Sequence, residues 1–210
     1  MDIQVWLAYF VASWAIALSP GSGAVLSMSH GLAYGVRKTT ATIVGLQLGL
    51  SVVLLVAGMG VGALLLASAT AFLVVKVLGA GYLIWLGLSQ WRAPVAAEAG
   101  DVLLPNAELS VRQRVMRGFL TNVTNPKGIV FMVAVLPQFI DTGRPMAMQL
   151  LVLLATTVGV DLVVMHGYAF LASRLQGLLR TVRARRVQNR VFGGVLMVMG
   201  ASLALVRRGG

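Results

Sequence analysis

Two ionisable side chains, Asp161 and Lys127, fall inside long apolar stretches of the sequence. A charge in the middle of a membrane is costly, so a charge found there is usually paired or takes part in transport. We expect Asp161 to take up and release a coupling proton, and Lys127 either to bind a substrate carboxylate or to pair with Asp161. The alternatives are a structural ion pair for Asp161 and, for Lys127, a side chain that reaches the membrane interface.

Two prolines interrupt apolar stretches, in Ser19-Pro20-Gly21 and in Asn125-Pro126-Lys127. A proline inside a helix removes a backbone donor and clashes with the carbonyl one turn earlier. In a membrane, the freed backbone groups are tolerated where other protein groups or a water-filled cavity meet them. The two breaks therefore predict a central substrate site, where the free N–H groups of a half-helix can receive a carboxylate. A structural kink is the alternative for each break.

Polar side chains accompany both breaks. Asn122, Asn125 and Pro126 share one helix face, at spacings of three and four residues. Gln47 occupies in the first half of the chain the place that Asp161 occupies in the second, and as a neutral amide it is expected only to hydrogen-bond. Amides and hydroxyls can bind an amino acid's ammonium and hydroxyl groups, or simply hold helices together. The predicted substrate site consists of Ser19, Pro20, Gly21, Ser22, Gln47, Asn122, Asn125, Pro126 and Lys127, with Asp161 as the proton-coupling residue.

The composition argues against an enzyme, a metal site and a nucleic-acid partner. There is no Cys, and the two histidines, His30 and His166, are too few and too far apart for a zinc motif. No Ser/His/Asp set has convincing catalytic spacing, so neither catalytic residues nor a cofactor is expected. The net charge of +11 comes from Lys and Arg between the apolar stretches, where cytoplasmic loops carry them, so no nucleic-acid partner is expected.

The elements that must position these side chains are membrane spans. Of the 210 residues, 58% are apolar and 11% are charged, and the apolar residues form long runs. No ten-residue alternation of apolar and polar residues, typical of a membrane barrel, is present, so the sequence predicts an all-α integral membrane protein. The whole chain, 1–210, is expected to form a single transmembrane transporter domain. Each run is close to the length of about 20 residues that crosses the hydrocarbon core. The six expected transmembrane helices are 3–27, 39–66, 70–91, 117–140, 146–172 and 191–207.

The basic residues predict the orientation. With the N-terminus outside, twelve Lys and Arg residues fall in inner segments and four in outer ones, so both termini are expected outside. A polar stretch over 92–116 is expected to be a cytoplasmic linker between repeat one, 1–91, and repeat two, 117–210. Because each repeat has an odd number of spans, the two three-helix repeats would insert in opposite orientations, which is a common transporter design.

Several motifs, in order along the whole chain, resemble the RhtB/LysE family of amino-acid exporters. They are Leu18-Ser19-Pro20-Gly21-Ser22-Gly23-Ala24, Gly45-Leu46-Gln47-Leu48-Gly49, Gly81-Tyr82-Leu83-Ile84-Trp85-Leu86-Gly87, Asn122-Val123-Thr124-Asn125-Pro126-Lys127 and Pro137-Gln138-Phe139-Ile140. The resemblance implies multi-pass insertion in a bacterial inner membrane and export of amino acids or their derivatives, driven by the proton gradient.

Within that family, Ser22-Gly23 and Gln90-Trp91-Arg92 are most similar to the homoserine and homoserine-lactone exporters. Threonine, leucine or another small amino acid remains an alternative substrate, and a passive channel for small solutes is an alternative of a different class. The expected partners are the amino-acid substrate and membrane lipid. The glycine-rich helix faces also permit a homodimer.

Overall fold

The computed structural model describes residues 1–19, 21–67, 69–92, 109–141 and 143–174, with positions 190, 194, 197, 198 and 201. These residues form helices and no strand, so the all-α prediction is confirmed for the part of the chain that the structure describes. The elements are α1 (Ile3–Leu18), α2 (Ser22–Ala67), α3 (Ala69–Arg92), α4 (Val111–Val123), α5 (Pro126–Val135), the 3-10 helix η1 (Leu136–Phe139) and α6 (Met146–Arg174).

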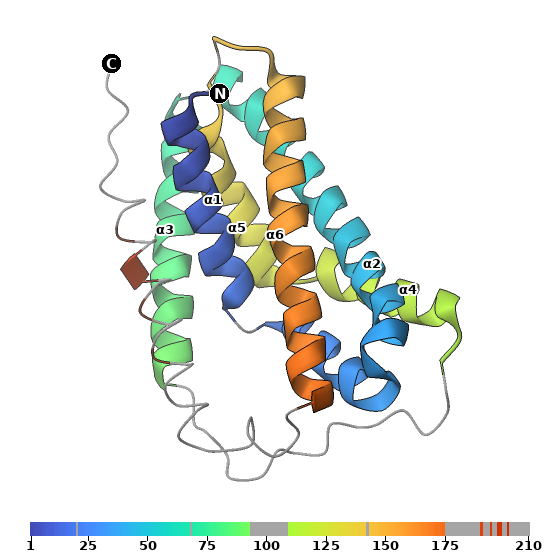
Figure 1. The fold of residues 1–210 in the computed structure, drawn as a ribbon. Helices are drawn as coiled ribbons and strands as arrows, with labels where there is room; N and C mark the ends of the chain where they lie inside the picture. The colour runs from blue at the N-terminus through green and yellow to red at the C-terminus, as the bar shows by residue number, and fades with distance from the viewer. Residues whose placement is uncertain are drawn as a thin grey trace.

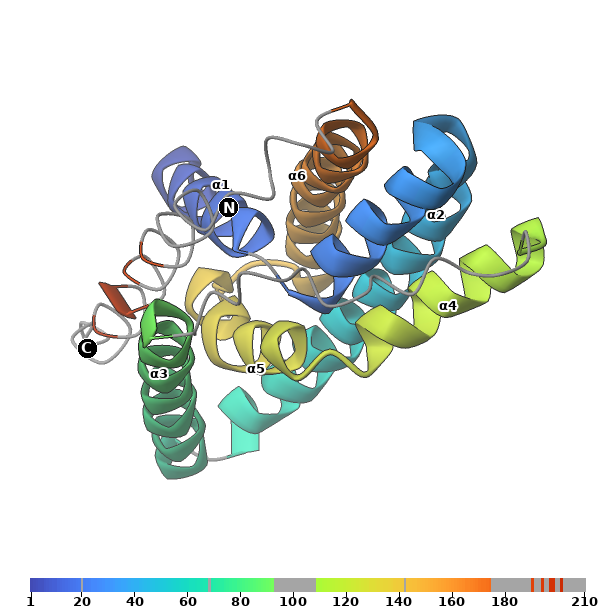
Figure 2. The same ribbon diagram turned by 90° about the horizontal axis from the view of Figure 1, so that it is seen from below.

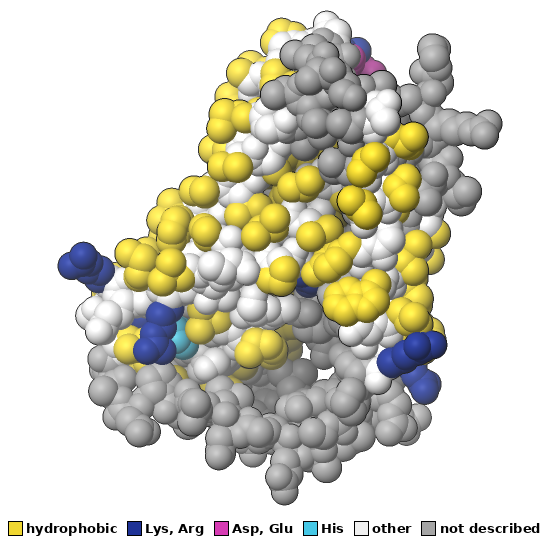
Figure 3. All heavy atoms as spheres, turned by 180° about the vertical axis from the view of Figure 1, so that it is seen from behind, with side chains coloured by type: hydrophobic (Ala, Val, Ile, Leu, Met, Phe, Trp, Pro, Cys, Tyr) yellow, Lys and Arg dark blue, Asp and Glu magenta, His cyan; other side chains and the backbone are white. Residues whose placement is uncertain are grey.

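The long helices form a bundle. Figure 1 shows α1, α3 and α6 running from the end of the molecule that carries the N-terminus toward the opposite end, and α5 and most of α2 running back. The shorter α4 lies at the opposite end, beside α2, as the view from below also shows (Figure 2). Hydrophobic side chains cover much of the described surface, and Lys and Arg gather toward its lower margin (Figure 3). This distribution is typical of an integral membrane protein.

Two of the described helices are long and apolar enough to cross a membrane by length and composition, Ser22–Gly60 within α2 and Met146–Arg174. The helices Val111–Val123 and Pro126–Phe139 form a bent pair with 51° between its parts, which adds a third span if the pair is counted as one. The α1 helix is apolar but shorter. The expected spans 70–91 and 146–172 coincide with α3 and α6, whereas most of 191–207 lies outside the described residues.

The expected first span, 3–27, is wrong at its end. Helix α1 stops at Leu18, and Ser19 has an extended backbone (φ −71°, ψ 117°). This is the conformation that a following proline imposes, because its ring clashes with a helical residue before it. The residues after the break belong to α2, which continues through a kink at Gly35 (φ 73°) into the expected span 39–66. Glycine adopts this left-handed conformation without the steric cost that a side chain adds.

The expected fourth span, 117–140, is also divided. Residues 117–123 belong to α4, which starts at Val111, so the predicted linker 92–116 ends earlier than expected. Ser110 and Gln113 form a capping box there, with each side chain bonded to the other's backbone N–H. The polar first turns of α4 do not suit hydrocarbon, and the helix instead packs on α2. A Cβ at Gly118 would overlap the backbone of Thr42, so glycine permits this close approach.

The core has two clusters of buried apolar side chains. One lies between α1, α2, α5 and α6 and includes Tyr9, Phe131, Leu136 and Leu153. The other joins α1 and α2 to α6 and includes Ile43, Leu46, Met165 and Ala169. Residues of both clusters line one cavity, so the two clusters hold the helices around it.

Candidate functional site

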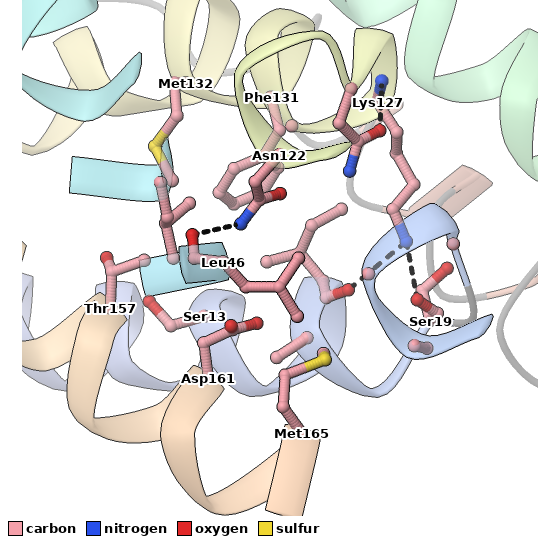
Figure 4. Close-up of a pocket in the computed structure, with 18 residues that line it drawn as sticks. Ser13, Ser19, Leu46, Asn122, Lys127, Phe131, Met132, Thr157, Asp161 and Met165 are labelled. Carbon is pink, nitrogen blue, oxygen red and sulfur yellow. Dashed lines mark hydrogen bonds between the residues drawn. The ribbon is translucent and has the colours of Figure 1, made fainter. Parts of the chain in front are cut away.

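The cavity has a volume of about 60 Å³ and is lined by α1, α2, α4, α5 and α6 (Figure 4). A space of this size holds several water molecules. Both helix breaks reach it. Six of the ten predicted site residues line the cavity: Ser19, Gly21, Asn122, Asn125, Lys127 and Asp161.

The other predicted residues have different places. Ser22 is the exposed first residue of α2, and Pro126 is the exposed first residue of α5, a position that suits its missing N–H. Neither is among the cavity-lining residues, nor is Gln47, which contacts the site through Asp161. Pro20 lies outside the described residues.

Asp161 and Gln47 are bonded to each other, one from α6 and one from α2. The Nε2 group of Gln47 donates to Oδ2 of Asp161 at 2.6 Å. Gln47 is buried, with 7% of its surface exposed, and its Oε1 has no hydrogen-bond partner among the described residues. The carboxylate is therefore held by one amide donor on one side and borders the cavity on the other.

Lys127 spans the cavity to the end of α1. Its Nζ donates to the backbone oxygen of Ser19 at 2.5 Å and is 3.5 Å from that of Ile16. The last carbonyls of a helix have no partner within the helix and carry a partial negative charge, so an ammonium group is favourable there. Tyr168 of α6 also bonds to the C-terminal end of α1, because its hydroxyl donates to the oxygen of Leu18 at 2.7 Å.

The ion pair between Lys127 and Asp161, one of two outcomes expected for Lys127, does not occur. The ion pairs among the described residues join Arg144 to Asp2 and to Asp141, at the end of the molecule that carries the N-terminus. The cavity thus contains an ammonium and a carboxylate that are bonded to different groups.

The second break, between α4 and α5, is closed by its own asparagines. Asn125 is the N-cap of α5, and its Oδ1 accepts a hydrogen bond from the backbone N–H of Lys127 at 3.2 Å. Asn122 holds α4 to α2, because its Nδ2 donates to the oxygen of Leu46 at 2.8 Å. Both asparagines therefore have structural bonds as well as a position on the cavity wall.

Sequence reasoning missed two hydroxyl residues of the cavity, Ser13 and Thr157. Thr157 accepts a hydrogen bond from the hydroxyl of Tyr9, at 2.5 Å, and donates its own hydrogen to the oxygen of Leu153, at 2.9 Å. A signal for Thr157 was present, since it precedes Asp161 by four residues and so shares its helix face. Ser13 has the same relation to Tyr9, but nothing in the sequence marked that face of α1 as part of the site.

The two histidines are not neighbours in a site. His30 is buried and its Nδ1 lies 2.6 Å from the hydroxyl oxygen of Thr42, whereas the Nδ1 of His166 lies 2.8 Å from the oxygen of Leu162. No group of three or more His, Cys, Asp or Glu residues with a geometry for metal occurs among the described residues.

Comparisons with known proteins agree over the length of the chain. A family model described as LysE type translocator matches residues 14–207. A membrane protein of Vibrio cholerae is 44% identical over 99% of this chain and 100% of its own. A homoserine/homoserine lactone efflux protein of Salmonella typhimurium is 41% identical over 99% of both chains. A leucine efflux protein of Klebsiella pneumoniae is 29% identical over 96% of this chain and 95% of its own. No solved structure matches.

Proposed function

The chain belongs to the LysE-type translocator family, and on that basis we propose that it exports small amino acids, with homoserine and homoserine lactone as the first candidate substrates. The family match confirms the resemblance that the sequence motifs predicted. The names of the relatives support efflux as the activity, and transport as the class of function in place of enzymatic catalysis. The structural observation that carries the proposal is a cavity, at two helix breaks, that holds an ammonium and a carboxylate not paired with each other.

This arrangement of charges suits a zwitterion. An amino acid presents a carboxylate and an ammonium group, and its binding is favoured where each meets the opposite charge. We assign the carboxylate to the side of Lys127 and the ammonium to the side of Asp161. Homoserine lactone has no carboxylate, and its ring carbonyl takes the corresponding place as an uncharged acceptor.

Asp161 is the proposed proton-coupling residue. The Asp161–Gln47 pair can accommodate both protonation states, because an amide offers a donor to a carboxylate and an acceptor to a protonated acid. A flip of the Gln47 amide would exchange its two ends, and before the flip its Oε1 has no partner among the described residues. Proton uptake from outside would then weaken ammonium binding and release the substrate, which couples export to the proton gradient.

The proposed architecture has six spans, with both termini outside a bacterial inner membrane. Helices α1, α2 and α3 alternate in direction, and α5 and α6 continue the alternation (Figure 1), which supports two repeats of opposite orientation. Most of the described basic residues belong to segments far from the N-terminus, which are the kink of α2, the helix α4 and the last turns of α3 and α6: Arg37, Lys38, Arg92, Arg112, Arg114, Arg117 and Arg174. This bias supports the end of the molecule far from the N-terminus as cytoplasmic.

Counterflow in proteoliposomes tests the proposed function. Vesicles are loaded with unlabelled homoserine, homoserine lactone, threonine, leucine or lysine, and the uptake of external labelled homoserine is followed. A carrier exchanges label for load and accumulates it transiently, whereas a passive channel only equilibrates it. We expect accumulation with the homoserine load. Homoserine that exchanges with no load, in vesicles that contain folded protein, would exclude it as the substrate.

The substitution Asp161→Asn tests whether this residue couples transport to the proton gradient. It removes the titrating group while keeping the size of the side chain, so we expect a pH gradient to drive uptake in the natural protein but not in the variant. Asp141→Asn is the matched control, because Asp141 is an exposed carboxylate of the loop before α6, and gradient-driven uptake should persist in it. Gradient-driven uptake that survives Asp161→Asn would exclude this residue as the coupling group.

A further inference from the structure

The hydroxyl of Ser13 is used differently from several other helix hydroxyls among the described residues. Serines and threonines within helices commonly donate to the carbonyl four residues earlier. Thr39, Ser51, Thr156 and Thr157 do so here, at 2.7–2.9 Å. Ser13 does not, and its Oγ has no hydrogen-bond partner in the part of the chain that the structure describes, although only 2% of the residue is exposed.

A buried hydroxyl without a partner is costly, so such a group is expected to have a role. Ser13 lines the cavity, and Figure 4 draws it between Thr157 and Asp161. Its neighbours of similar chemistry are already engaged. Thr157 bonds to Tyr9 and Leu153, and Oδ2 of Asp161 bonds to Gln47. The Tyr9 hydroxyl also lies near Ser13, but it is hydrogen-bonded to Thr157. Ser13 therefore offers the cavity a hydroxyl that has no hydrogen bond of ordinary geometry among the described residues.

We propose that Ser13 is the specificity-determining residue for the side chain of the exported amino acid, and that its Oγ pairs with a substrate hydroxyl. This inference rests on the proposed function and deepens it, since it selects hydroxylated amino acids, such as homoserine, over apolar ones of the same size. In homoserine lactone the ring oxygen accepts the hydrogen of Ser13.

The positions along α1 agree with this assignment. Ser13 and Ser19 are six residues apart, which is about 9 Å along a helix with a rise of 1.5 Å per residue. Lys127, bonded at Ser19, holds the carboxylate at one end of that interval. A short amino acid with a hydrogen bond at each end can bridge this distance. The Asp161 carboxylate lies on the facing helix, where it meets the ammonium group.

The bond between Tyr9 and Thr157 fixes the far wall of this subsite. Tyr9 is fully buried, and its ring contacts Phe139 edge to face, with the ring centroids 5.0 Å apart. Tyr9 belongs to the same buried apolar cluster as Leu136, Leu150 and Leu153. A substrate methyl group that points at Ser13 would leave the serine hydroxyl unpaired. A site that hydrogen-bonds a substrate hydroxyl discriminates strongly against the analogue that lacks it.

Homoserine and norvaline form the matched pair of test compounds, because norvaline has a methyl group where homoserine has its hydroxyl. In proteoliposomes that exchange labelled homoserine, each unlabelled compound is added as a competitor. We expect norvaline to compete roughly tenfold or more weakly than homoserine in the natural protein. In Ser13→Ala the two should compete within about threefold of each other, because the hydroxyl to be satisfied is gone.

Ser27→Ala is the matched control. Ser27 on α2 is also fully buried, with an Oγ that has no partner among the described residues, but it is not among the residues that line the cavity. Its substitution should leave the preference for homoserine unchanged. A preference that persists in Ser13→Ala, or that is also lost in Ser27→Ala, would overturn the assignment.

Exchange measurements on the natural protein distinguish the proposed export function from the proposed role of Ser13. If it exchanges amino acids but accepts norvaline as well as homoserine, the role of Ser13 is excluded and amino-acid export stands. If folded protein exchanges no amino acid at all, the proposed function fails and the subsite fails with it. A thermal-stability measurement on Ser13→Ala distinguishes a changed preference from a damaged fold. We expect little change in stability, since the Ser13 hydroxyl has no hydrogen-bond partner among the described residues.

Discussion

The two helix breaks that border the cavity are satisfied in different ways. At the end of α1, the free backbone groups are carbonyls, and their donors come from distant parts of the chain, Lys127 on α5 and Tyr168 on α6. At the start of α5, the free groups are N–H donors, and the acceptor is local, since Asn125 caps the helix that it precedes. The α1 break therefore depends on tertiary contacts, whereas the α5 break is closed by its own sequence.

This difference indicates which break can respond to a substrate. A carboxylate that binds Lys127 competes with the carbonyls of Ile16 and Ser19 for the same ammonium group. Binding would loosen the end of α1 and leave the cap of α5 intact. The α1 break is thus expected to move during transport while the α5 break stays as the fixed wall.

Lys127→Met should have the largest effect of these substitutions on the α1 break and on homoserine exchange. It removes the donor to the α1 carbonyls and the proposed partner of the substrate carboxylate. A hydrogen bond to a charged group contributes about 1.5–3 kcal/mol, so loss of the bond to the substrate carboxylate should lower homoserine exchange roughly tenfold to a hundredfold. Counterflow measures the exchange, and hydrogen–deuterium exchange over residues 14–19 measures the opening of α1.

Lys38→Met is the control for a lost positive charge, because Lys38 is exposed and lies on α2 away from the cavity lining. Exchange should be near normal in this variant. Lys127→Met protein with normal exchange and a protected α1 end would show that the break does not depend on this ammonium group.

The sequence predicted the break at each proline and the side chains beside it, because the effect of proline on a helix is local. It also placed Gln47 and Asp161 in the predicted site, at matching positions of the two halves, and the structure joins them directly. It did not predict that Lys127 would bond to the end of α1, since that contact crosses more than a hundred residues and depends on how the helices pack.

The sequence failed in a different way at α4. The run over 117–140 was expected to be one span broken at Pro126, and hydropathy alone does not register that its first residues belong to α4, which starts at Val111 and packs on α2. That contact depends on glycines, and a Cβ at Gly45 would overlap the backbone of Val115. Ser13 was missed because its place on the cavity wall, and the lack of a hydrogen-bond partner for its Oγ among the described residues, depend on how the helices pack, which no local pattern contains.

Asn125→Ala should have a smaller, local effect. It removes the side-chain acceptor at the N-cap of α5, which typically costs about 1 kcal/mol. We expect lower thermal stability in detergent and more hydrogen exchange at the start of α5, with the end of α1 unchanged. Asn125→Ser is the control, because a serine hydroxyl also caps helices well. Increased exchange at the end of α1 in Asn125→Ala would show that the two breaks are coupled after all.

Tyr168→Phe should have the smallest effect, and it tests whether the α1 end depends on both of its distant donors. The substitution removes the hydroxyl that donates to Leu18 and keeps the ring, so we expect a loss of about 1 kcal/mol in stability and a modest rise in hydrogen exchange at Leu18. Tyr34→Phe is the matched control, since the buried hydroxyl of Tyr34 has no partner among the described residues and its loss should cost nothing. If Tyr168→Phe opened the end of α1 as widely as Lys127→Met does, the tyrosine would be an equal anchor. The substrate could then not release α1 by drawing Lys127 away, because the bond from Tyr168 would still hold the helix end in place.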